Sequence, residues 1–261
     1  MESITGRANE KIKYAVKLRD SAAFRKDEGR FFIEGARLCA DAASSGEEIQ
    51  MLFATQAAFE KYAEYIERIL PVCRQSFLIS HEVAEKLSDT KNAQGVFCVC
   101  KMLDKNANIS KIIYDGKYVA LEELSNPSNF GAICRTAEAL GLDGIIVSGG
   151  CDIYSPKAQR AAMGALFRLP VIECADFCAF ASQLKAHGMN VLASVPAADA
   201  RLITAIDKTR GTVLIIGNEG NGLSQAAIDA ASECVTIPMR GRAESLNAAA
   251  AASIMMWEMM R

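Results

Sequence analysis

Three polar loops, each directly after a short segment that reads as a strand, hold most of the residues that could do chemistry. "SNPSNFG" follows residues 121–124, "GNEGNG" follows residues 213–216 and "PMRGRAESLN" follows residues 235–237. If these segments are strands of one parallel sheet, the loops lie at the sheet edge where ligands bind in such folds. The last two loops lead into helical segments, whose free N–H groups favour anionic ligands. The loops therefore predict a small-molecule or nucleotide site.

Each loop also has a simpler structural explanation. Asn129 could be the N-cap of the helix that carries Arg135, and Ser245 could be the N-cap of the last helix. Glu219 could be a solvated turn residue, and Arg135 could form a surface ion pair with Glu138. Three elaborate loops at one sheet edge favour a site over three unrelated coincidences.

The same motifs narrow the chemistry. "GNEGNG" has the order G-x-x-G-x-G, which is not the G-x-G-x-x-G dinucleotide fingerprint, and no G-x-x-x-x-G-K-[ST] motif is present. Nine Cys are scattered without a CxxC pair and the chain has only two His. This argues against a metal site and predicts a reducing, cytoplasmic location. There is no apolar stretch of about 18 residues and no apolar leader, so we expect no membrane association.

The elements that position these loops alternate in two α/β blocks. We expect a small domain at 1–103, a polar linker "DKNANIS" at 104–110 and a larger domain at 111–261. Short Val- and Ile-rich strands between helices in the larger domain predict a parallel sheet covered on both faces. The strands expected there are 117–124, 143–150, 189–195, 211–217 and 234–237, and the helices are 129–142, 155–166, 177–188, 223–231 and the chain's final segment.

Charge is unevenly distributed. Residues 1–37 carry nine Lys/Arg against six Asp/Glu, whereas the remainder carries 20 against 25, and the net charge is −2. A basic segment on an acidic body is typical of a nucleic-acid contact surface, although a solvated amphipathic helix gives the same pattern. The composition, 51% hydrophobic and 23% charged, suits a globular protein.

The motifs resemble those of a known family. "NPSNFGAICRTAEALG", "IIGNEGNGLS" and "IPMRGRAESLNAAAAASI" resemble, in order, the three signature motifs of SpoU-type (TrmH-like) RNA 2′-O-ribose methyltransferases of the SPOUT superfamily. "SPKAQRAAMGALFRLPV" is also similar to that family, and "NEKIKYAVKL…FFIEGARL" resembles its substrate-binding domain, which has a small ribosomal-protein fold. The chain differs from the family's usual motifs at Asn126, where Asp is usual, and at Ala162-Met163-Gly164, where Ser-x-Gly is frequent.

The resemblance implies a deep trefoil knot at the C-terminus, with the last helix threaded through a loop; true knots are otherwise very rare. The run from Ala248 to Ala252 makes a slim helix, which permits close backbone approach where the chain passes through. Met255, Met256 and Trp257 supply bulk beyond it.

The resemblance also implies S-adenosylmethionine as the cofactor, bound in the knot largely by backbone groups and without a metal. The matching cofactor-binding positions are Gly217, Ile237, Leu246, Met239 and Ser194.

Five residues match the family's catalytic positions, namely Arg135, Asn129, Glu219, Ser245 and Asn247. Because guanidinium holds its proton strongly, we expect Arg135 to grip a phosphate and orient the ribose. Asn129 is expected to position Arg135 or the ribose, and Glu219 to fix the loop or Arg135. Ser245 and Asn247 are expected to hold substrate and loop backbone.

The resemblance implies an rRNA substrate and a homodimer that completes the site, with 245–261 and 156–168 as candidate interface elements. Three alternatives remain in RNA chemistry: a tRNA ribose methyltransferase, an rRNA methyltransferase that confers antibiotic resistance, and an RNA-binding module without catalysis. The complete set of catalytic positions argues against the last. A plain nucleotide-binding Rossmann protein is disfavoured by the glycine order.

Overall fold

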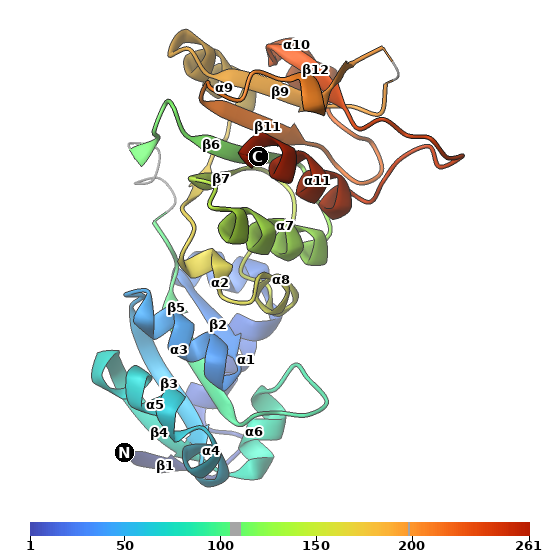
Figure 1. Ribbon diagram of the computed structural model, residues 1–261. Helices are drawn as coiled ribbons and strands as arrows, with labels where there is room; N and C mark the ends of the chain where they lie inside the picture. The colour runs from blue at the N-terminus through green and yellow to red at the C-terminus, as the bar shows by residue number, and fades with distance from the viewer. Residues whose placement is uncertain (105–110, 198) are drawn as a thin grey trace. The chain divides into compact units, whose positions relative to one another are not determined.

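The computed structural model describes residues 1–104, 111–197 and 199–261 (Figure 1). Contacts between residues divide the chain into two compact units. The first unit comprises 1–103 together with 152–167, and the second comprises 104–151 together with 168–261. The chain therefore leaves the second unit once, contributes 16 residues to the first, and returns. Of the expected linker 104–110, all but its first residue lies outside the described residues.

The first unit is built on a five-stranded mixed sheet of order β1-β4-β3-β5-β2. β1, β4 and β3 are parallel, while β5 runs antiparallel to β3 and β2. Its strands are β1 (Glu2–Ile4), β2 (Arg30–Glu34), β3 (Ile49–Thr55), β4 (Cys73–Ile79) and β5 (Val96–Lys101). Its helices are α1 (Glu10–Asp20), α2 (Ala22–Glu28), α3 (Ala36–Ser44), α4 (Gln56–Lys61), α5 (Ala63–Ile69), α6 (His81–Leu87) and α8 (Pro156–Ala162), with 3₁₀ turns η1 (Leu70–Val72) and η3 (Ala165–Phe167).

Buried contacts hold the 152–167 segment to the first unit. Arg25 is 3% exposed, and its Nε donates to Asp152 Oδ2 at 2.8 Å. The ring of Phe31 lies 4.7 Å from that of Tyr154 and 6.3 Å from that of Phe167, measured between centroids. A buried Arg is tolerated only when it is paired, so the Asp152 contact is part of this packing.

The second unit is built on a seven-stranded, fully parallel sheet of order β10-β12-β9-β11-β6-β7-β8 (Figure 1). Its strands are β6 (Lys117–Glu122), β7 (Gly144–Ser148), β8 (Val171–Glu173), β9 (Asn190–Ser194), β10 (Arg201–Leu202), β11 (Thr212–Ile216) and β12 (Glu233–Thr236). Its helices are α7 (Pro127–Leu140), α9 (Phe177–Ala186), α10 (Gln225–Ala230) and α11 (Ala248–Met260), with η4 (Ile203–Ala205). The prediction of a parallel α/β domain preceded by a small α/β domain is confirmed.

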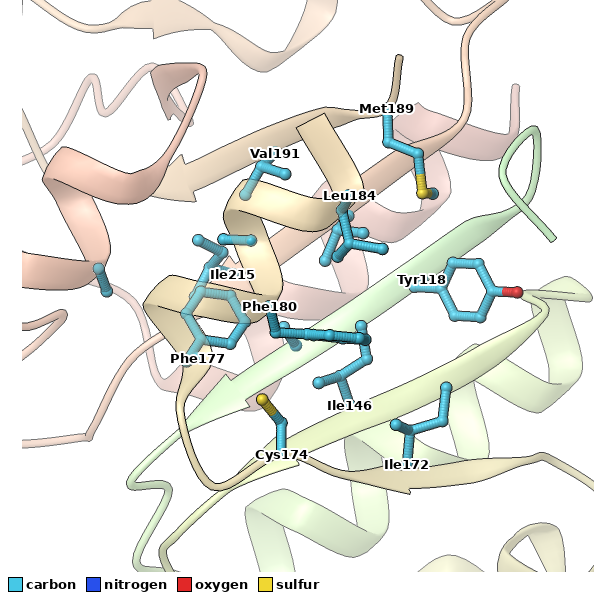
Figure 2. Packing of buried hydrophobic residues seen from close by; sticks show 14 residues of the cluster. Tyr118, Ile146, Ile172, Cys174, Phe177, Phe180, Leu184, Met189, Val191 and Ile215 are labelled. Atoms are coloured by element: carbon cyan, nitrogen blue, oxygen red, sulfur yellow. The ribbon is translucent and has the colours of Figure 1, made fainter. Parts of the chain in front are cut away.

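Helices α9 and α10 pack on one face of this sheet. Figure 2 shows the rings of Phe177 and Phe180 in the layer between α9 and the strands, beside Ile146 and Ile215. The strands alternate between faces with period two, so neighbours such as Leu214 are buried against the other face. Strands buried on both faces explain the near-continuous Val/Ile runs in the sequence.

Helices α7 and α11 pack on each other on the other face, and α11 also reaches β6 and β11. Small residues at their contact permit this approach, since the hydroxyl oxygens of Thr136 and Ser253 lie 3.3 Å apart. Further along α11, Met255 and Met256 are buried. None of the described helices is both long and apolar enough to cross a membrane.

Candidate active site

The "GNEGNG" loop, residues 217–222, folds back on itself at the carboxyl end of β11. Asn218 and Gly222 exchange two backbone hydrogen bonds of 3.0 Å. Gly222 has φ +69°, which favours glycine, and a Cβ at Gly217 would overlap the backbone of Gly222. Glycine is therefore required at both ends of this turn.

Side chains tether this loop to the end of β6 in two places. Asn218 Nδ2 donates to the carbonyl oxygen of Glu123 at 2.8 Å. The carboxylate of Glu122 accepts from the backbone N and Oγ of Ser224 at 2.9 and 2.6 Å. The two glutamates after the buried part of β6 thus hold the neighbouring strand's loop in place.

Glu219 makes a third and denser tether, to the β6–α7 loop. Its Oε2 accepts from Ser125 N at 3.0 Å and Ser125 Oγ at 2.8 Å, and its Oε1 accepts from Asn126 N at 3.0 Å and Asn129 Nδ2 at 2.8 Å. Burial raises the pKa of Glu219, but the hydrogen bonds from Asn129 and Ser125 outweigh it and lower the pKa to about 2. The residue is thus a carboxylate at neutral pH, and its oxygens bind the first loop.

Asn129 and Asn247 extend this tether to α11. Asn129 is 7% exposed, and its Oδ1 accepts from Asn247 Nδ2 at 3.2 Å. Asn247 Oδ1 in turn accepts from Ala249 N at 2.9 Å and from Ala250 N. A continuous series of hydrogen bonds therefore joins Glu219, Asn129 and the first turn of α11, one residue from each of the three motifs.

This geometry corrects two of the simpler explanations. The N-cap of α11 is Asn247, not Ser245, which is exposed in the preceding loop. The N-cap of α7 is Asn126, whose Oδ1 accepts from Ser128 N, whereas Asn129 lies buried inside the helix. Glu219 is also more than a solvated turn residue.

Arg135 lies on α7 with its side chain exposed. Within the described parts of the chain it has no hydrogen bond or ion pair, and the alternative pairing with Glu138 is wrong, because Glu138 Oε1 accepts from Arg168 Nε at 2.8 Å. An exposed guanidinium without a partner remains available to a phosphate or another anion.

A cavity of about 730 Å³ lies at the carboxyl ends of β9, β11 and β12 and beside the start of α11. The structure brings all five predicted cofactor-binding residues to its wall, together with Glu219 and Ser245; the five are Ser194, Gly217, Ile237, Met239 and Leu246. Asn129, Arg135 and Asn247 do not line it. Two predicted catalytic residues thus share the cavity, and the other three lie on α7 and at the N-terminus of α11.

The cavity wall also contains polar residues that were not predicted from the sequence, namely Asp199, Asn218, Asn221, Thr236 and Glu244. All five stand in or next to the loops that follow β9, β11 and β12, so proximity to the motifs was the available signal. Among the described residues, no three His, Cys, Asp or Glu cluster as metal ligands would. Backbone groups, apolar side chains and a few carboxylates make this wall suitable for a mixed polar and apolar organic ligand.

Comparison with known proteins places this fold and site in a class. The model of the SpoU rRNA Methylase family matches residues 116–257, and that of the MRM3-like substrate binding domain matches residues 9–98. The chain belongs to the SpoU rRNA methylase family, which confirms the resemblance of its three motifs. Membership implies the trefoil knot, with α11 as the threaded helix.

Several characterised relatives are similar over most of their length. The chain is 28% identical to the 23S rRNA (guanosine(2553)-2′-O)-methyltransferase RlmP of Bacillus subtilis, with 99% of each chain covered. It is 30% identical to a 23S rRNA (uridine(2479)-2′-O)-methyltransferase of Streptomyces viridochromogenes, covering 89% of this chain and 83% of that one. The crystal structure of AdoMet-bound rRNA methyltransferase from Sinorhizobium meliloti superimposes with a TM-score of 0.87 at 29% identity, covering 99% of this chain and 97% of that one.

Proposed function

We propose that this protein is an S-adenosylmethionine-dependent 2′-O-ribose methyltransferase that acts on 23S-type rRNA. One observation carries the proposal. The five residues assigned to the cofactor from the motifs, which come from three separate strand ends, line one cavity. A tRNA ribose is the second candidate, since a relative from Synechocystis that is 31% identical to this chain is named as a tRNA/rRNA methyltransferase.

The cavity residues suit S-adenosylmethionine. Ile237, Leu246 and Met239 offer an apolar surface for an adenine ring, and the tight Gly217 turn exposes backbone groups to polar atoms of the ligand. When bound, the cofactor supplies a methyl group on a positively charged sulfur. The carboxylates of Glu219 and Glu244 at the wall favour such a cation electrostatically.

The chain's own residues then orient the RNA. Arg135, which is exposed and has no partner in the described parts of the chain, grips the phosphate next to the target ribose and fixes the 2′-hydroxyl. Transfer by in-line displacement needs such positioning, which by itself contributes several kcal/mol to lowering the barrier. Asn129, held between Glu219 and Asn247, keeps α7 at a fixed distance from the cavity loop and from α11.

A homodimer that completes the site belongs to the same proposal, as does a cytoplasmic location. Helix α11 exposes two large apolar side chains three residues apart, Ile254 at 45% and Trp257 at 59%. Residues at this spacing share one helix face. An exposed pair of this size on a helix is typical of a protein contact surface.

Two measurements test the proposal. Mapping of 2′-O-methyl groups across total RNA from cells with and without the protein should show one or a few sites in 23S rRNA that depend on it. Calorimetry should show S-adenosylmethionine binding without added divalent ions. Loss of a tRNA methyl instead would select the second candidate, and binding that requires a metal would refute the cofactor assignment.

A further inference from the structure

A second cavity, of about 510 Å³, lies wholly within the first unit. Three segments form it: the start of α3, the loop before β5, and α8 of the 152–167 segment. Its lining residues include Gly35, Arg37, Lys91, Asn92, Gln159 and Arg160. The volume falls in the range of small-molecule sites, about 300–1,000 Å³.

The walls of this cavity are held by hydrogen bonds that do not involve its cations. Glu34 accepts from Thr90 Oγ1 at 2.8 Å and from Asp89 N at 2.9 Å, which fixes the loop before β5. Gln94 Oε1 accepts from Ala36 N at 2.9 Å, which binds the same loop to the start of α3. The cavity is therefore a built feature of this unit.

Gln159 gives the cavity an unfilled polar group. The residue is 2% exposed, and its Nε2 donates to the carbonyl oxygen of Ile153 at 2.8 Å. Because a carbonyl can only accept, the amide orientation is fixed, and Oε1 is left without a hydrogen-bond partner among the residues that the structure describes. A buried acceptor without a donor is costly, about 1–3 kcal/mol, so the site calls for an N–H or O–H group.

Two cationic side chains at this cavity have no ion-pair partner among the described residues. Arg37 and Lys91 are exposed, and neither has an ion pair or hydrogen bond within the part of the chain that the structure describes. The third, Arg160, forms an ion pair in which its Nη1 lies 2.8 Å from Asp89 Oδ2, although this contact does not have hydrogen-bond geometry. A phosphate is the ligand that unpaired Arg and Lys side chains bind best.

We infer that this cavity takes one unstacked nucleotide of the RNA substrate, with the base toward Gln159 and the phosphate at Arg37 and Lys91. Proteins read RNA sequence mainly on splayed-out single-stranded bases, which a concave site with a fixed acceptor can select by their N–H groups. The choice of RNA rests on the proposed function. This nucleotide-recognition site is separate from the methyl-transfer cavity, and a segment of α8 forms part of its wall.

The test uses the full-length protein with 23S rRNA. Ultraviolet crosslinking at 254 nm, nuclease digestion and mass spectrometry should find nucleotide adducts on peptides that contain residues 35–41, 88–94 or 156–163. Arg37→Ala with Lys91→Ala should reduce the magnitude of the slope of log affinity against log salt by about 0.7, since each phosphate contact with a single strand contributes about 0.7 and the two cations share one phosphate. Lys61→Ala with Arg68→Ala, two cations of the same unit outside the cavity, is the matched control.

Methyl-transfer kinetics separate this inference from the proposed function. Arg37→Ala/Lys91→Ala and, independently, Gln159→Met should raise the KM for RNA about tenfold, with kcat and S-adenosylmethionine affinity unchanged. Melting temperatures on the same samples check that Gln159→Met folds; the exposed pair can be removed without touching the core. If the wild-type protein methylates 23S rRNA and both variants have the same KM for RNA as the control, the nucleotide site is refuted and the proposed function stands. No methylation by the wild type overturns the proposed function.

Discussion

Glu219→Gln tests whether the carboxylate tether organises the cavity loop. The four donors around Glu219 need an acceptor on both oxygens, and a glutamine would turn an NH₂ group toward two of them. The fall in pKa from 4.5 to about 2 corresponds to about 3 kcal/mol if fully retained. Because Glu219 is exposed, solvent screening reduces the expected loss to about 1 kcal/mol.

This loss has a defined pH dependence. The folded state holds Glu219 ionised more strongly than the unfolded chain does, so the stabilisation is complete above the unfolded pKa of about 4.5. It declines as pH falls below that value and disappears near the folded pKa of about 2. The difference in unfolding free energy between wild type and Glu219→Gln should therefore be constant from pH 7 to about 5.5 and shrink toward pH 3.

Urea unfolding over this pH range and calorimetry with S-adenosylmethionine at pH 7 measure both consequences. If the variant's residues 217–222 must be ordered again when the cofactor binds, the lost stabilisation of about 1 kcal/mol weakens cofactor affinity by about fivefold. Glu67→Gln, an exposed glutamate on α5, removes the same charge without touching the loop and should change neither quantity. A Glu219→Gln protein with wild-type stability and cofactor affinity, or a stability difference that does not change with pH, refutes the reasoning.

The remaining predictions concern the RNA side and the assembly. Arg135→Ala should reduce methyl transfer by at least 100-fold while melting temperature and S-adenosylmethionine affinity change little, because Arg135 has no partner among the described residues and does not line the cavity. Arg135→Lys should restore little activity, because an ammonium group lacks the planar set of donors of guanidinium. Near wild-type activity of the alanine variant would show that Arg135 does not position the RNA. Asn247→Ala should destabilise the protein by about 1 kcal/mol in urea unfolding through loss of the α11 N-cap, and an unchanged midpoint would contradict that role. Trp257→Glu should convert a dimer to a monomer in sedimentation and lower activity; a wild-type protein that is monomeric and fully active excludes the shared site.

The sequence was sufficient for the elements with strong periodicity and end signals. The helix expected at 129–142 begins slightly earlier, because Asn126 caps it and Pro127 occupies its first position. Residues 56–70, whose pattern indicates one helix, form two helices, α4 and α5, interrupted at Tyr62, whose backbone (φ −122°) is not helical. The short strand Val171–Glu173 was missed, since three residues after a proline give no periodicity to detect.

Some features of the candidate site could likewise be predicted from the sequence, and others could not. The cavity-lining positions follow from motif matches, but the partners of Glu219 lie 90–94 residues away, and no local pattern indicates which donors a lone glutamate will meet. Glu138 shows the opposite failure. Its helical spacing from Arg135 suggested a local pair, and a residue 30 positions away, Arg168, binds it instead. Local spacing sets what is possible, and tertiary packing then selects among the candidates.

Because residues 152–167 pack in the first unit, they affect how the protein folds during synthesis and whether it can be cleaved into separate domains. During synthesis the first unit cannot complete its packing when residue 103 emerges, because Phe31 still lacks Tyr154 and Phe167, and Arg25 still lacks Asp152. N-terminal domains ordinarily fold as soon as their last residue emerges. Here that residue is 167, by which point part of the second sheet has also been made. A single cut in the 104–110 region therefore yields no independent domain: one piece lacks a buried partner for Arg25, and the other exposes two aromatic rings.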